Sequence, residues 1–102
     1  MSYEDEIREL ESEWMPEDGF FWKIRQGQFS EEDFRRALTK VSNIPIPNDA
    51  LLPRRLVSLL WYIPLFMQWQ TERVQENGGD IPGLSMAITT MTNKIERLLG
   101  VP

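Results

Sequence analysis

The sequence predicts an all-α fold, a compact single-domain bundle of four to five helices around a proline-kinked apolar central helix. Three observations support this prediction. Apolar residues recur at helical spacing along much of the chain, strand patterns are nearly absent, and the segment Leu56–Trp69 is the most apolar run and carries no charge. Because that run is shorter than the about 20 residues that cross a bilayer, we expect a helix buried on most of its surface. With 102 residues the chain has room for one hydrophobic core, so residues 1–102 form one predicted domain.

A first helix is predicted before Pro16, which should end it because the residue before a proline avoids the α conformation. Ser2 is the expected N-cap. The apolar residues of this helix recur three and four positions apart and share one face; they are Tyr3, Ile7, Leu10 and Trp14. The next apolar cluster, at 20–24, is interpreted as a short helix over residues 20–26 closed by Gly27, with a strand as the alternative.

The clearest local signal precedes the next helix. Ser30 is a good N-cap, acidic residues follow it, and Phe29 and Phe34 occupy the positions of a hydrophobic staple. We expect this helix to end near Asn43. Residues 44–49, with the sequence IPIPND, have prolines at alternate positions and should form an extended connector.

The central helix is expected to start at an N-cap supplied by Asn48 or Asp49, with Pro53 in its first turn. Pro64 lacks the N–H that would bond to the carbonyl of Leu60, so we expect a kink between these two residues. A break into two separate helices at this point is the alternative.

A polar continuation of the central helix is predicted to run to Glu76, where the Asn-Gly-Gly sequence at 77–79 ends it. Asp80 should cap a last helix with Pro82 in its first turn, and Gly100 should end it. The apolar stripe of this last helix consists of Leu84, Ile88, Met91, Ile95 and Leu98.

The composition removes most catalytic and metal-binding chemistry from consideration. The chain has no cysteine and no histidine, which excludes disulfides, thiolate metal sites and acid–base catalysis by imidazole. The Gly-Gly-Asp sequence at 78–80 lacks the lysine and the preceding strand of a phosphate loop, and we interpret it as a helix cap. We therefore predict no enzymatic activity, no cofactor and no metal. The first ten residues are acidic and unlike a secretory signal, so a cytoplasmic location is expected.

The negative charge is concentrated at one end of the chain. The first 20 residues hold eight acids and one arginine, a net of −7, whereas the remaining 82 hold ten bases and eight acids, a net of +2. An end this acidic repels phosphate, so we expect a basic protein as the partner, with nucleic acid disfavoured and no membrane. The predicted partner-binding residues are Glu6, Glu9, Glu11, Glu13, Trp14, Glu17, Asp18 and Trp22. Trp14 and Trp22 are the predicted anchors, and a solvated acidic face without a partner is the alternative.

Two other patterns have simpler structural interpretations. The aromatic residues of 20–22 and of the central helix could stack on bases or sugars, but core packing is preferred, with at least one of Trp61 and Trp69 at the edge of the core. A basic patch could meet phosphate, but pairing with the N-terminal acids is the preferred interpretation. The residues of that patch are Arg35, Arg36, Lys40, Arg54 and Arg55.

These features are typical of a protein whose role is to bind another protein. The leading hypothesis is a bacterial or phage-type inhibitor or immunity protein whose acidic segment, residues 4–18, covers a basic cleft such as a nuclease active site. The alternative is a structural or assembly protein that forms a homodimer through apolar surface of the central and last helices.

Overall fold

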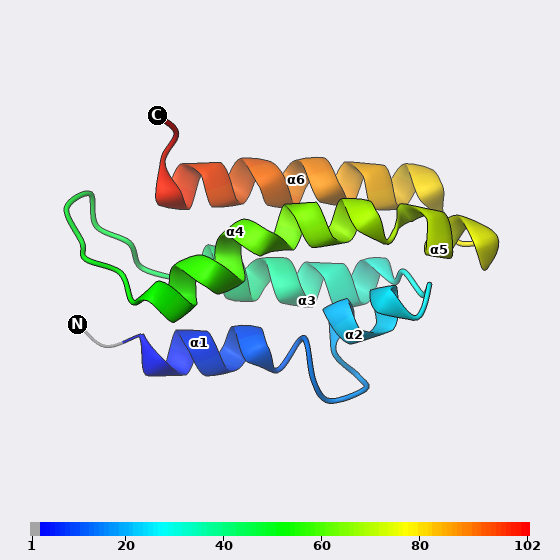
Figure 1. Cartoon of the computed structure of the whole chain (residues 1–102), viewed down its shortest axis with the longest axis horizontal. Coiled ribbons are helices and arrows are strands. Elements are labelled where there is room, and N and C mark those ends of the chain that lie inside the picture. Colours follow the sequence, from blue (N-terminus) through cyan, green and yellow to red (C-terminus); the bar gives the residue numbers. More distant parts are fainter. Residues whose placement is uncertain (1–2) are drawn as a thin grey trace.

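The computed structural model describes residues 3–102 and contains six helices, with no strand among these residues (Figure 1). Their bounds are α1 Glu4–Glu11, α2 Phe20–Arg25, α3 Glu31–Ser42, α4 Arg54–Trp69, α5 Thr71–Glu76 and α6 Ile81–Leu99. The all-α single-domain prediction is confirmed. Ser2, the expected first N-cap, lies outside the described residues. Within residues 3–102, no helix combines the length and the hydropathy that a membrane crossing requires.

The apolar helix α4 is the centre of the bundle. It packs against α6 along one side and against α1 along another, and α3 lies behind it in Figure 1. Its buried residues are Leu56, Leu59, Leu60, Ile63, Phe66 and Met67. The stripe predicted on the last helix is buried at Leu84, Met91 and Ile95, which confirms the amphipathic pattern of α6. The core therefore forms where α4 meets its neighbours, as the apolar run predicts.

Two expectations for the ends of α4 are wrong. Asn48 and Asp49 do not cap the helix, which begins only at Arg54. Pro53 takes the N-cap position with ψ of 140°, an extended conformation, so the chain cannot enter the helix any earlier. At the other end the helix stops at Gln70, whose N–H bonds to the Met67 carbonyl in a tighter turn. The polar continuation to Glu76 is thus a separate helix, α5, and the bundle has one helix more than expected.

Pro64 does not divide the central helix. The helix runs without interruption from Arg54 to Trp69, so the alternative of two helices broken at this proline is wrong. Figure 1 shows that the axis of α4 changes direction along its length, in agreement with a kinked helix.

The first helix is shorter than predicted. It ends at Glu11, well before Pro16, and residues 12–19 form a loop that leads into α2. We call this segment the 12–19 loop. The residues at 20–25 are helical, which decides against a strand, and Gly27 follows with the positive φ of 82° that its predicted closing role requires.

The predicted start of α3 is confirmed in detail. The Asp33 N–H donates to the Ser30 hydroxyl oxygen at 3.3 Å, the bond expected of an N-cap. The staple residues Phe29 and Phe34 both contact the ring of Phe20, with centroids 6.2 and 5.7 Å away. The two ends of the staple therefore join α3 to the start of α2.

Replacement of the α3 cap tests this local assignment. Ser30→Ala removes the acceptor for the Asp33 N–H, and we expect the free energy of unfolding to fall by about 1 kcal/mol. Ser42→Ala, at the exposed end of the same helix, is the matched control and should change it by less than about 0.5 kcal/mol. Urea unfolding followed by tryptophan fluorescence measures both values. Equal effects of the two substitutions would contradict the capping role.

Candidate protein-interaction site

The carboxylate of Glu13 is buried, with a side-chain exposure of only 2%. The Arg36 guanidinium on α3 donates to both of its oxygens, from Nε to Oε2 at 2.9 Å and from Nη2 to Oε1 at 2.8 Å. Lys40 Nζ lies 2.7 Å from Oε2, and the Phe20 N–H donates to Oε1 at 2.9 Å. One carboxylate thus joins the 12–19 loop, α2 and α3 through charge-assisted hydrogen bonds, the strong class of such bonds.

A second buried carboxylate balances the charge of this cluster. Asp33 accepts from Arg36 Nη1 at 2.9 Å and from Lys23 Nζ at 2.9 Å. Arg36 Nη2 also donates to the backbone carbonyl of Asp18 at 3.0 Å, which fixes the far end of the 12–19 loop. The buried acids are therefore each paired, as desolvated charges must be if the fold is to be stable.

The environment of Glu13 changes its pKa. Burial alone would raise the pKa, but the hydrogen bonds from Arg36, Lys40 and the Phe20 N–H outweigh it and lower the pKa from 4.5 to about 2. Hydrogen bonding to Glu13 in turn raises the pKa of Arg36 above its usual range. Both groups are therefore charged at neutral pH, and the pair stabilises the folded state.

The backbone of Glu13 is engaged as well. Its carbonyl accepts from the N–H groups of Phe21 at 2.9 Å and Trp22 at 3.2 Å, at the start of α2. Gly19 lies so close that a Cβ built on it would be 2.3 Å from the Glu13 carbonyl oxygen. Only glycine fits this approach, and the 12–19 loop is held at both its side-chain and backbone contacts.

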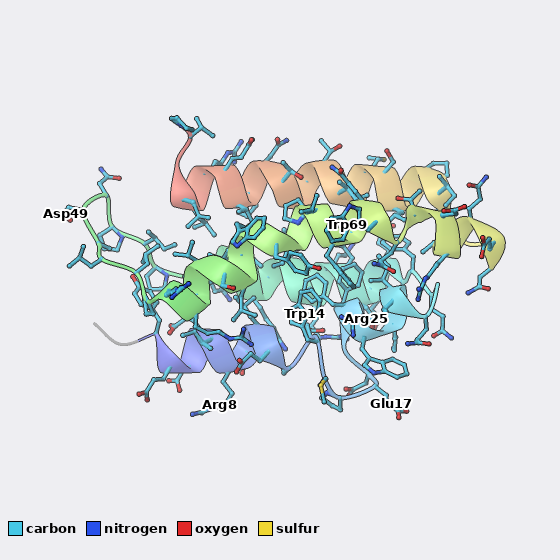
Figure 2. The ribbon with its side chains drawn as sticks, in the orientation of Figure 1. Arg8, Trp14, Glu17, Arg25, Asp49 and Trp69 are labelled. Carbon is cyan, nitrogen blue, oxygen red and sulfur yellow. The ribbon has the colours of Figure 1, made fainter. Side chains whose placement is uncertain are left out.

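The outer side of the 12–19 loop faces solvent. Met15 is 74% exposed, and Glu17 and Asp18 are exposed beside it. Trp22, at the start of α2, is partly exposed. Figure 2 shows Glu17 at the outer edge of the molecule, directed away from the bundle. A fixed loop therefore presents two carboxylates and an apolar side chain to any partner.

The acids of α1 are less available than the sequence suggests. Glu11 accepts from the Arg55 guanidinium at 2.7 Å, and Glu9 lies 3.4 Å from Lys40 Nζ. Glu6 is partly exposed. The expected pairing of basic residues with the N-terminal acids is confirmed for three of them, namely Arg36, Lys40 and Arg55. Glu13 is removed from the partner-facing set because it is buried, and sequence reasoning missed the three helix residues that hold it.

Trp14 lies on the inner side of the 12–19 loop, not at its tip. Its ring stacks on Phe21 with centroids 4.5 Å apart and contacts Phe66 at 4.7 Å. The guanidinium of Arg25 lies over the same ring at 5.9 Å, as Figure 2 illustrates. Trp14 therefore borders the core and is only partly accessible, so it is a weaker candidate for an anchor than Trp22.

Both tryptophans of α4 are more exposed than either predicted anchor. Trp61 is 55% exposed and Trp69 is 58% exposed, which confirms that at least one lies at the edge of the core. Most other aromatic side chains of the cluster are buried or half-buried in the core, as preferred from the sequence. The apolar composition of α4 gave a signal for exposed tryptophans, but the pattern alone did not indicate which face stays uncovered.

Among residues 3–102, no three acidic side chains converge in a way that would hold a metal ion. Comparison with protein-family models, with characterised proteins and with solved structures finds no match to this chain. The chemistry of the described surface is therefore the basis of the functional argument.

Substitution of the buried carboxylate tests its role. Glu13→Gln keeps the shape but loses the charge, and we expect the free energy of unfolding at pH 7 to fall by about 2–3 kcal/mol. Because the pKa of Glu13 is lowered in the folded state, its stabilisation is complete above about 4.5 and is lost as the pH falls toward about 2. The difference between variant and wild type should shrink over the same interval.

The matched control is Glu11→Gln, which breaks an exposed ion pair with Arg55 and should cost less than about 1 kcal/mol. Urea unfolding at a series of pH values measures both variants. An unchanged stability of Glu13→Gln at pH 7 would contradict the assigned role.

Proposed function

We propose that this chain is a small acidic protein-binding module without catalytic activity, which acts by covering a basic surface of another protein. The observation that supports it best is the 12–19 loop, held by Glu13 and presenting Met15, Glu17 and Asp18 to solvent. A preformed loop loses little conformational entropy on binding, so its contacts contribute more of their energy to affinity.

The proposed mode of binding combines steering with anchoring. Exposed carboxylates at one end of a chain of net charge −5 attract a basic partner and raise the association rate. Met15 and the partly exposed Trp22 would then supply apolar contact at the centre of the interface. Inhibitor or immunity proteins that mask a toxin nuclease need this combination, and we propose this class, acting in the cytoplasm.

The second candidate is a homodimer built on apolar surface of the central and last helices. Three large apolar side chains there are exposed and favour it: Trp61 and Trp69 on α4 and Met86 on α6. The two candidates differ in stoichiometry and in the face that they use.

Charge reversal in the 12–19 loop tests the proposed mode. The double variant Glu17→Lys and Asp18→Lys should slow association with a basic nuclease partner about tenfold or more at low salt, and the difference should shrink as salt is added. Stopped-flow binding and nuclease inhibition against a panel of basic nuclease domains provide the measurement.

The matched control reverses two exposed charges elsewhere, Asp49→Lys in the connector and Glu96→Lys on α6, and so changes the net charge by the same amount. A control that slows association equally would show a net-charge effect without a site. Failure to bind any member of the panel would contradict the proposal.

Sedimentation equilibrium separates the second candidate. The proposed function predicts a monomer at micromolar concentration. A tight dimer that Trp61→Ala or Trp69→Ala dissociates would instead support the homodimer.

A further inference from the structure

A second exposed surface lies on α4, separate from the outer side of the 12–19 loop. It consists of Trp61, Tyr62, Leu65 and Trp69, and we call it the aromatic face. Trp61 and Trp69 are each more than half exposed and stand about 12 Å apart along the helix, at about 1.5 Å per residue. Exposed aromatic side chains in such proximity are unfavourable in water and are typical of binding surfaces.

The aromatic face is rigid before any partner arrives. The Tyr62 ring contacts both Trp61 and Trp69, each with centroids 5.8 Å apart, and contacts Trp14 at 6.1 Å. The residues beneath it, such as Ile63, are fully buried in the core. Ordering these rings therefore adds little entropic cost on binding.

A groove continues from the aromatic face toward α1. One open hollow of about 430 Å³ is lined by Trp14, Arg55, Leu59, Trp61 and Tyr62, together with Ser58. A neighbouring hollow of about 440 Å³ shares Trp14 and Arg55 with it and reaches Arg8 and Met15. The two hollows give the face a concave extension with aromatic walls.

The rim of this groove is basic although the chain as a whole is acidic. Arg8 and Arg55 line it, and the guanidinium of Arg25 lies on the Trp14 ring at its floor. Glu11 is the single carboxylate among the lining residues of the two hollows, and both of its printed bonds go to Arg55. The charge beside the aromatic face therefore complements carboxylates.

We propose that the aromatic face and its groove dock an acidic amphipathic helix of a partner protein. The distance from Trp61 to Trp69 matches the apolar side of such a helix, with anchors three and four residues apart over about two turns. One apolar anchor enters the groove between Trp14 and Trp61, and flanking carboxylates meet Arg55 and Arg25. The proposal does not rest on the proposed function, because it uses a different face and the opposite charge.

A second copy of this chain is a poorer occupant of the face. Two-fold pairing places the same patch against itself, so the arginines of one copy would oppose those of the other. Each copy also carries a net charge of −5, which adds repulsion at low salt.

The test is selection of helical peptides from a displayed random library against the full-length chain, followed by fluorescence anisotropy of the enriched peptides. We expect the enriched sequences to be acidic, with aromatic or leucine residues at helical spacing. Trp61→Ala and Trp69→Ala should each weaken binding about tenfold or more. Arg55→Gln should weaken it less and reduce its dependence on salt.

Met86→Ala on α6 removes another exposed apolar side chain outside the aromatic face and should leave the peptide affinity unchanged. Circular dichroism checks that each variant keeps its helices. The proposal is overturned if no peptide is enriched, if the enriched peptides are basic, or if the tryptophan variants bind as tightly as the wild type. Self-association through Trp61 and Trp69 would likewise overturn it in favour of a second copy.

Discussion

The buried carboxylate of Glu13 is the interaction on which the arrangement of the N-terminal half depends. It accepts from Arg36, Lys40 and the Phe20 N–H, so a single side chain joins α2, α3 and the loop between α1 and α2. A carboxylate that has lost its water needs all of these partners, because an unpaired charge in the interior is strongly destabilising. The conformation of the 12–19 loop follows from that requirement and not from its own local propensity.

This constraint places two surfaces of opposite character on one rigid segment. The outer side of the 12–19 loop carries Glu17 and Asp18, whereas its inner side carries Trp14, whose ring forms part of the groove beside α4. Arg25 lies on that ring, so the basic side of the groove is fixed to the same cluster. A shift of the loop would therefore alter both surfaces together, although their proposed partners differ in charge.

Local signals in the sequence predicted most of the helices. The cap at Ser30, the amphipathic stripe of α6 and the apolar run of α4 all depend on residues close in the chain, and each is confirmed. Glu13 was not distinguishable from Glu9 or Glu11 by such signals. Its burial depends on Arg36, 23 residues away, and periodicity does not report a contact at that separation.

The same reason explains the errors in the site. The acidic segment was expected to present its carboxylates to a partner, yet the structure pairs Glu9, Glu11 and Glu13 with bases from α3 and α4. The exposed tryptophans of α4 depend on how its neighbours cover it, which the apolar run alone does not specify. Composition predicted the charge and the aromatic content of the surface, and tertiary packing decided where each lies.

Native-state hydrogen exchange at the Phe20 amide tests the central claim most directly, because this N–H donates to the buried Glu13 carboxylate. If the carboxylate fixes the 12–19 loop, this amide exchanges only on global unfolding, as slowly as the core amides of α4. Exchange at the rate of the exposed connector at residues 47–51 would show that the loop opens independently and would contradict the account.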